Sequence, residues 1–335
     1  MKTSDFDYHL PESSIAQTPV DPRDSSRLLV LDRKTGGVTH NHFREIGKFL
    51  NPGDLLVFNQ TRVIPARLFA HKSTGGRVEL LLLRREDLLM WECLAGGKGL
   101  SAGKELTIEN GPNAKIVAVL DGSRRRIRFS EPIETFFPAA GHVPLPPYIH
   151  TPLSDPERYQ TVYARDPGSA AAPTAGLHFT PQLLDGFKKS GVNIAFVTLH
   201  VGLDTFAPVT EDDPADHLIH TEWCELSQQT TDLITQTSKQ GGRIVAVGTT
   251  SVRTLESLKA GPPFKPFAGP TELFILPGYK FKLVDVMVTN FHLPKSTLLM
   301  LVSAFAGREM ILDTYKLAIK ENYRFYSFGD AMLIL

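Results

Sequence analysis

Two patterns of hydrophobic and polar residues divide this chain. From about residue 61 to residue 148, short runs of alternating apolar and polar residues are separated by glycine turns such as Gly75-Gly76 and Gly96-Gly97. Period-two alternation with closely spaced turns is typical of the strands of a small barrel or sandwich. Strands are predicted there at residues 78–83, 105–108, 115–120 and 126–129.

After Pro173, helical and strand patterns alternate. Helices are predicted at residues 180–190, 227–240, 251–259, 295–306 and 309–321, and strands at 192–200, 243–247, 273–276 and 283–288. Ser227 provides an N-cap and Gly241 a C-terminal glycine for the second helix. Such alternation favours a mainly parallel sheet covered by helices. Two apolar segments near the N-terminus, residues 27–32 and 54–58, are expected to join this sheet.

The predicted fold class is therefore α/β, with a large α/β domain and a smaller inserted all-β, barrel-like domain. The length of 335 residues also suggests two domains more than one. The α/β catalytic domain is expected to be discontinuous, over residues 1–59 and 150–335, and the small β domain to span residues 60–149.

The charge balance narrows the function classes. Lysine and arginine number 36, as do aspartate and glutamate, so the formal net charge is zero. This argues against a nucleic-acid-binding surface over the whole protein but leaves room for a local basic face. Residues 61–150 hold thirteen basic and nine acidic residues, a local charge of +4. The densest basic cluster is Arg124, Arg125 and Arg126, which can be a solvated turn or a phosphate contact.

The cysteines and the apolar segments bear on location. Cys93 and Cys224 are the two cysteines and form no CxxC pair, which argues against a disulfide framework and a cysteine zinc site. The first ten residues lack the apolar core of a signal peptide. The longest apolar run, residues 298–306, is shorter than the roughly 20 residues that span a bilayer. We expect a cytoplasmic protein with no membrane segment.

The segment GSAAAPTAGLHFT, residues 168–180, is rich in small residues that let a backbone approach a ligand closely. It carries His178 just before Thr180-Pro181, which has the pattern of an N-cap followed by proline at the first helical position. A loop of this kind at a helix N-terminus is a good place for a small-molecule site. An ordinary crossover loop is the alternative interpretation.

A second candidate is the strand at residues 243–247, which continues into GTTS and then a helix. Ligands of open α/β sheets bind at the carboxyl ends of strands, and helix N-termini favour anions. Thr249, Thr250 and Arg253 are therefore predicted to hold a carboxylate or phosphate, with plain helix capping as the alternative. The GxxxxGK spacing of a Walker loop is missing.

Several other polar residues lie at predicted strand ends. His200 ends the strand at residues 192–200, and His292 lies in a loop before a helix. His217, His220 and Glu222 could be read as a metal site, but such spacing is common without metal. A lone histidine is more often structural than catalytic. Asp330, in an aromatic-rich tail, is either a cap or a functional group with a tuned pKa.

The longer motifs carry a resemblance to a known family. They include DYHLP at 7–11, PRDSSRL at 22–28, PGDLLVFN at 52–59, the small-residue segment at 168–180, TLHVG at 198–202, and residues 247–256 and 290–303. In this order they resemble the S-adenosylmethionine:tRNA ribosyltransferase-isomerases of queuosine biosynthesis, over essentially the whole length. That family has an α/β domain and a smaller β-barrel domain.

The resemblance implies a reaction. The ribosyl part of S-adenosylmethionine moves onto the aminomethyl group of a 7-deazaguanine at the tRNA wobble position and isomerises, giving epoxyqueuosine with release of adenine and methionine. It implies no metal and no cofactor beyond S-adenosylmethionine as co-substrate, and a monomer is expected. A conventional S-adenosylmethionine-dependent methyltransferase and a non-catalytic tRNA-binding protein are the alternatives.

The implied chemistry needs a base for the C5′ proton, an acid for adenine, an anion site and stacking surfaces. His178 and His200 are the first choices for proton transfer, with His292 third. Thr174, Thr249, Thr250 and Arg253 are expected to bind S-adenosylmethionine, Asp330 or Glu222 to face the guanine edge or the amine, and Tyr163 and Phe179 to stack on a base. Arg27, Arg62, Arg67, Arg124, Arg125 and Arg126 are expected to contact tRNA phosphates. Asp204 stands where the family pattern has glycine.

Overall fold

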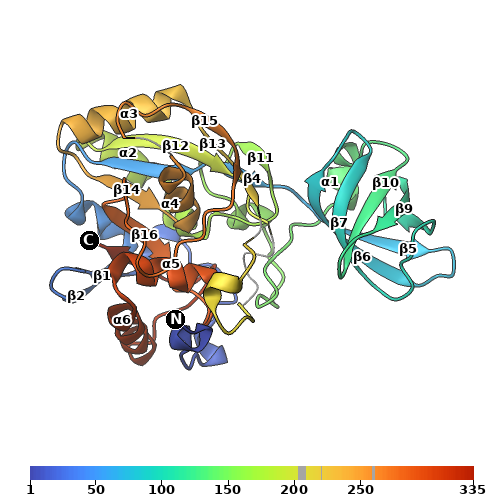
Figure 1. Ribbon diagram of the computed structural model, residues 1–335, viewed down its shortest axis with the longest axis horizontal. Coiled ribbons are helices and arrows are strands. Elements are labelled where there is room, and N and C mark those ends of the chain that lie inside the picture. Colours follow the sequence, from blue (N-terminus) through green and yellow to red (C-terminus); the bar gives the residue numbers. More distant parts are fainter. Residues whose placement is uncertain (203–208, 220, 259–260) are drawn as a thin grey trace. The chain divides into compact units, whose positions relative to one another are not determined.

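The computed structural model describes residues 1–202, 209–219, 221–258 and 261–335. The chain divides into two compact units (Figure 1). The first comprises Met1–Arg62, Pro147–Asp166 and Ala172–Leu335, and the second comprises Val63–Pro146 and Pro167–Ala171. Within the described parts of the chain, no helix is both long and apolar enough to cross a membrane.

The first unit is built on a nine-stranded mixed sheet, in the order β15-β13-β12-β3-β14-β16-β17-β1-β2. Its strands are β1 (Arg27–Leu31), β2 (Val38–His42), β3 (Leu55–Asn59), β12 (Asn193–Leu199), β13 (Glu222–Leu226), β14 (Ile244–Val247), β15 (Phe267–Thr271), β16 (Val286–Asn290) and β17 (Ala331–Ile334). The central strands β12, β3, β14 and β16 are parallel to one another. Their carboxyl ends therefore meet at one edge of the sheet.

Antiparallel pairs flank this parallel centre. β13 pairs with β12 and β15 on one side, and β17 pairs with β16 on the other, while β2 closes the far edge against β1. The predicted α/β class is confirmed, with a sheet whose parallel strands are confined largely to its centre.

Alternate residues of the strands serve two separate hydrophobic cores, because successive side chains point to opposite faces. Leu55 and Val57 of β3 lie in one core, which also includes residues of the helices α4, α5 and α6. Leu56 and Phe58 lie in the other core, with Phe179 and the α2 residue Phe187. Both faces of the sheet are thus covered, which explains why β3 reads as a continuous apolar run.

The predicted helices are confirmed to within a few residues. They are α2 (Pro181–Lys189), α3 (Gln228–Lys239), α4 (Thr249–Glu256), α5 (Thr297–Ala306) and α6 (Arg308–Lys320). Thr180 and Ser227 cap α2 and α3 by accepting the backbone N–H of Leu183 and Thr230, each at 3.2 Å. These caps are the ones that the sequence predicted.

The second unit contains a closed antiparallel barrel, in the order β10-β7-β6-β5-β8-β9. Its strands are β5 (Arg67–Lys72), β6 (Arg77–Arg85), β7 (Met90–Gly96), β8 (Glu105–Ile108), β9 (Asn113–Val119) and β10 (Arg124–Phe129), and the short helix α1 (Phe137–Ala140) follows. Leu80, Cys93 and Ile127 are fully buried inside it. The barrel-like domain is confirmed as a fold.

One predicted strand is wrong, and several strands were missed. Residues 273–276 are not a strand: β15 ends at Thr271, and the Leu273 carbonyl accepts a hydrogen bond from Arg253 Nε at 3.1 Å. The missed strands β2, β5, β7, β13, β15 and β17 are short or carry polar residues. Two further short strands, β4 (Thr61–Val63) and β11 (Asp166–Ser169), lie in the segments where the chain passes from one unit to the other.

Candidate active site

A pocket of about 650 Å³, counted to include the space at its open mouth, lies in the first unit. Residues that follow three parallel strands line it: Val201 after β12, Gly248 after β14, and Phe291 after β16. Its polar lining comprises Tyr148, Thr174, Thr249, Thr250, Thr289, Asn290, His292, Ser296, Tyr326 and Ser327. This is the edge where open α/β sheets bind ligands.

The small-residue segment forms one wall of the pocket, through Ala172, Pro173, Thr174 and Ala175. Gly176 behind that wall packs so closely that a Cβ atom there would overlap the Tyr163 hydroxyl. The close approach explains why this position is glycine.

The helix α4 begins at the pocket. Gly248, its N-cap, has φ +88°, a conformation that favours glycine. Thr249 and Thr250 follow it and both line the pocket. The Thr250 hydroxyl is buried and has no hydrogen-bond partner among the described residues, so it remains available to a ligand.

Arg253, one turn further along α4, points elsewhere. It forms an ion pair with Glu222 of β13, and its Nε donates to the Leu273 carbonyl at 3.1 Å. Glu222 also accepts the Gly202 backbone N–H at 3.1 Å. Neither side chain lines the pocket. The predicted direct contact of Arg253 with an anion thus lacks support, and its charge is already compensated inside the protein.

His292 is the histidine that lines the pocket. Its Nε2 lies 2.7 Å from the Thr289 hydroxyl. Burial lowers the pKa of His292 to about 3. The imidazole is therefore neutral near pH 7, which is the form that can accept a proton.

His178 lies one hydrogen bond behind the pocket. Its Nε2 is 3.2 Å from the side-chain nitrogen of Asn290, which does line the pocket, and its Nδ1 is 2.8 Å from the Ser26 hydroxyl. The ring stacks on Phe43 with centroids 4.9 Å apart. Burial, together with the charges of Arg324 and Arg23, lowers the pKa of His178 to about 3.

Comparison with known proteins decides the family. The family model "Queuosine biosynthesis protein" matches residues 3–334. Two S-adenosylmethionine:tRNA ribosyltransferase-isomerases are 52% identical (Staphylococcus haemolyticus) and 51% identical (Carboxydothermus hydrogenoformans), over 100% of both chains in each case. The crystal structure of S-adenosylmethionine tRNA ribosyltransferase from Thermotoga maritima is 42% identical, with a TM-score of 0.59, covering 99% of this chain and 100% of that one.

The chain belongs to the S-adenosylmethionine:tRNA ribosyltransferase-isomerase family. This family membership confirms three predictions made from the motifs: the resemblance, the enzyme class and the role in queuosine biosynthesis. The motifs of the ribosyltransferase-isomerase that contain Thr174, Thr249 and His292 meet in one pocket.

Other predicted residues of the ribosyltransferase-isomerase lie apart from this pocket. His200 is half-buried, with its Nδ1 2.8 Å from the Thr61 hydroxyl and its ring stacked on Trp223 at 5.7 Å. Burial lowers the pKa of His200. Its neighbour Val201 lines the pocket, whereas the His200 side chain does not.

Asp330 has a structural role. Its carboxylate is 2% exposed and accepts the backbone N–H groups of Arg27 and Arg324, each at 2.8 Å. Burial raises the pKa of Asp330, while these hydrogen bonds oppose the shift. Asp330 was interpreted above as either a cap or a functional group with a tuned pKa. These contacts agree with a cap.

The two predicted stacking residues are packed away from the pocket. Phe179 has no exposed surface and contacts Phe43 and Phe58 edge-on. Tyr163 packs against Phe58 and Phe196 at centroid distances of 4.8 and 5.7 Å. Both side chains support the loop from behind, and their packing gives no support to a role in stacking on a base.

The arginines predicted to contact tRNA have partners within the protein. Arg27 lies over the Tyr323 ring at 3.7 Å, Arg62 pairs with Glu157, and Arg67 pairs with Glu79 at 3.0 Å.

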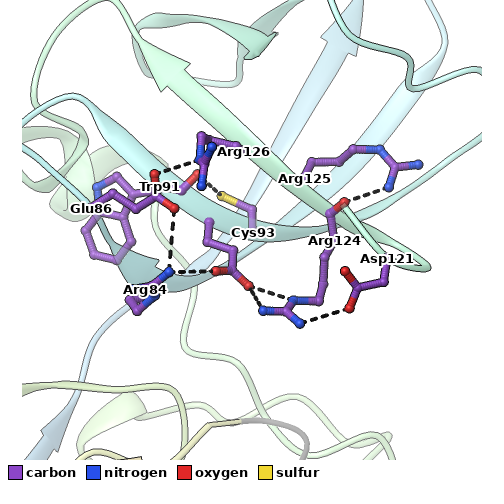
Figure 2. Close-up of polar contacts among 9 residues, drawn as sticks. Arg84, Glu86, Trp91, Cys93, Asp121, Arg124, Arg125 and Arg126 are labelled. Atoms are coloured by element: carbon purple, nitrogen blue, oxygen red, sulfur yellow. Dashed lines mark hydrogen bonds and ion pairs between the residues drawn. The ribbon is translucent and has the colours of Figure 1, made fainter. Parts of the chain in front are cut away.

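Figure 2 shows the basic cluster of the barrel. Arg124 pairs with Asp121, and Arg126 pairs with Glu86 at 2.7 Å. Arg124 also pairs with Glu92, and Arg125 donates to the carbonyls of Leu100 and Gly122. Contact of these arginines with tRNA stays a prediction, and their charges are partly compensated.

Two predictions fall on residues outside the described ranges, namely those for Asp204 and His220. His217 lies 2.9 Å from Glu211 through its Nδ1. In the described ranges, no group of three potential metal ligands is found.

Sequence reasoning missed Asn290, Tyr148, Tyr326 and Ser327, all of which line the pocket. Asn290 is the last residue of β16, and a polar residue at a strand end was the signal that could have found it. Tyr326 has φ +70°, which is rare for a residue other than glycine. Such strain is commonly found at functional sites.

Proposed function

We propose that this chain binds S-adenosylmethionine in the pocket at the carboxyl ends of β12, β14 and β16. It transfers the ribosyl group to the aminomethyl group of a 7-deazaguanine at the tRNA wobble position and isomerises it, and adenine and methionine leave. The observation that carries the assignment is the pocket itself, because it gathers the polar residues of three separate family motifs at the ligand-binding edge of the sheet.

The N-terminus of α4 is the proposed site for the methionine carboxylate. The backbone N–H groups of the first turn and the helix dipole favour an anion there. Thr249 and Thr250 add hydroxyl donors, and the Thr250 hydroxyl is buried without a partner in the described structure. Arg253 contributes through its pair with Glu222, by fixing the helix, and not by direct contact.

His292 is the proposed acceptor of the C5′ proton. That proton is acidified by the adjacent sulfonium, and a general base within hydrogen-bond reach must remove it. His292 lines the pocket and is held neutral by burial. His200, beside Thr61, is the second candidate, for proton transfer with the tRNA substrate.

Tyr148 and Tyr326 are the proposed stacking surface for a planar base. Their rings lie 4.6 Å apart, and both line the pocket. Proteins recognise bases taken out of a nucleic-acid stack by placing them against aromatic rings. These two tyrosines replace Tyr163 and Phe179 in that role.

We also propose an oligomeric state, a location and a cofactor requirement. The protein acts as a monomer in the cytoplasm, without a metal or separate cofactor. The α/β part, residues 1–59 and 150–335, carries the reaction. The barrel, residues 60–149, is proposed to contact tRNA through the basic residues whose carboxylate partners can be exchanged for phosphates.

Adenine release from S-adenosylmethionine, with and without tRNA bearing the aminomethyl-deazaguanine, tests the activity. Release that depends on this tRNA, with a ribosyl-derived mass gain on the base, is the expected result. S-adenosylhomocysteine in place of free adenine would identify a methyltransferase, and tRNA binding without a product would identify a binding protein.

A further inference from the structure

We infer that Asn290 is a positioning residue: its side-chain amide, held in one orientation, fixes the tautomer of His178 and makes Thr174 a hydrogen-bond acceptor toward the pocket. The group of the ligand that contacts Thr174 must then be a donor. The identity of the ligand as S-adenosylmethionine rests on the proposed function, whereas the hydrogen-bond directions rest on the structure alone.

The orientation of the Asn290 amide is set by a carbonyl. The side-chain nitrogen of Asn290 lies 3.2 Å from the backbone oxygen of Tyr326, which can only accept. Asn290 is 3% exposed, so water does not compete for this contact. Tyr326 itself has φ +70°, in the left-handed region that is rare for residues other than glycine.

The same amide nitrogen fixes the tautomer of His178. Both hydrogens of the NH₂ group are used, one on Tyr326 and the other on His178 Nε2 at 3.2 Å. Nε2 must therefore be unprotonated, and the ring carries its hydrogen on Nδ1, which donates to the Ser26 hydroxyl at 2.8 Å. A second proton, on Nε2, would face the NH₂ group of Asn290, and the added positive charge would be repelled by Arg324 and Arg23.

The amide oxygen of Asn290 then determines Thr174. The two oxygens lie 3.0 Å apart, and because the amide oxygen can only accept, the Thr174 hydroxyl must donate to it. Thr174 is half-buried at the pocket wall, and only its lone pairs remain for a ligand. S-adenosylmethionine offers four kinds of donor: the adenine amine, the two ribose hydroxyls and the methionine ammonium. Its carboxylate and ring nitrogens are excluded from this position.

The tautomer gives a test independent of activity. Histidine-selective ¹⁵N labelling, with the His178 signals assigned from a His178→Gln variant, should show the Nδ1–H form from pH 6 to pH 8. The Nε2–H form or an imidazolium would overturn the inference. Asn290→Asp leaves the shape unchanged but replaces the donor by an acceptor, so it should convert His178 to an Nε2–H or doubly protonated ring. Persistence of the wild-type tautomer in that variant would refute the coupling.

The acceptor role of Thr174 is tested by binding. Dissociation constants are measured for S-adenosylmethionine and for analogues that lack one donor each: 2′-deoxy, 3′-deoxy, N6-dimethyl, and deaminated at the methionine. Thr174→Val should weaken S-adenosylmethionine binding about three- to tenfold, and Thr174→Ser should restore it. The analogue that lacks the donor bound by Thr174 should have the same dissociation constant for Thr174→Val as for the wild type.

Equal weakening of all four analogues by Thr174→Val, or unchanged binding of S-adenosylmethionine, would overturn the acceptor assignment. Thr254→Val is the matched control, since the Thr254 hydroxyl donates within α4 to the Thr250 carbonyl. Failure of the wild-type chain to bind S-adenosylmethionine would instead overturn the proposed function and leave the tautomer result standing.

Discussion

Arg253 and Glu222 form an ion pair inside the protein, with side chains that are only 6% and 5% exposed. The pair connects the helix α4, whose N-terminus is the proposed anion site, to the strand β13. A buried pair adds little net stability, but removing one partner leaves an uncompensated charge in the interior. Its role here is to hold α4 in position beneath the pocket.

Glu222→Ala should therefore destabilise the protein strongly, by about 3–5 kcal/mol, the cost of leaving a buried arginine without its partner. Urea unfolding at pH 7 measures this loss. The double variant Glu222→Leu/Arg253→Met should be more stable than Glu222→Ala, because no buried charge remains. A double variant as unstable as the single one would show that the packing around the pair, and not its charge, matters.

The architecture was predictable where one pattern fills a whole element. β3 is apolar at four of its five positions and buried at all of them, and α3 has both its N-cap and its terminal glycine. β13 was missed because its residues alternate between buried and exposed over only five positions. β15, with Gly269 and Pro270 in its five residues, was missed in favour of the apolar segment that follows it, 273–276. That segment is contacted by Arg253 through the Leu273 carbonyl, which its own residues do not reveal.

The candidate site was predictable as a location and less so as a set of contacts. Strand ends and the small-residue loop pointed to Thr174, Thr249 and His292, which line one pocket. Residue type alone could not show that Arg253 is neutralised by a residue 31 positions earlier in the chain. Nor could it show that the amide of Asn290 separates His178 from the pocket, since these residues are 112 positions apart.

Thr250→Val should weaken binding of S-adenosylmethionine about three- to tenfold, which is the value of one hydrogen bond. Stability should be unchanged or slightly higher, because the hydroxyl that is removed is buried and has no partner among the described residues. Calorimetric titration and urea unfolding of the same variant separate the two effects. A loss of stability together with unchanged binding would place the Thr250 hydroxyl in the folded structure and not in the site.

Acid should destabilise the α/β unit through His178 and His292. Burial lowers the pKa of each to about 3, whereas an unfolded chain has a histidine pKa near 6.5. Between these values the unfolded chain binds more protons, so the stabilisation is fully present above about pH 6.5 and is lost as the pH falls toward 3. Each histidine should contribute about 2 kcal/mol of loss between pH 7 and pH 5.

Urea unfolding at several pH values checks this loss. His292→Asn and His178→Gln should each have a shallower dependence of stability on pH than the wild type, whatever their stability at pH 7. His150→Asn, at an exposed position, is the control and should keep the wild-type slope. Unchanged slopes in both buried-site variants would mean that these imidazoles titrate normally in the folded protein.

The carboxylate of Glu92 compensates the charges of two arginines of the barrel, Arg84 and Arg124. Its side chain is 5% exposed and lies between Arg84, at 3.3 Å, and Arg124. Glu92→Leu should destabilise the barrel by about 1–3 kcal/mol, less than for a fully buried pair, because both arginines can still reach water. Hydrogen exchange of the β7 and β10 amides reports this locally. The exposed Glu105→Leu serves as control.

If tRNA phosphates bind near these arginines, Glu92→Leu should tighten tRNA binding at low salt, since it releases two arginines from their carboxylate. Weaker binding of tRNA by a folded Glu92→Leu variant would contradict a direct role of Arg124 in contacting tRNA.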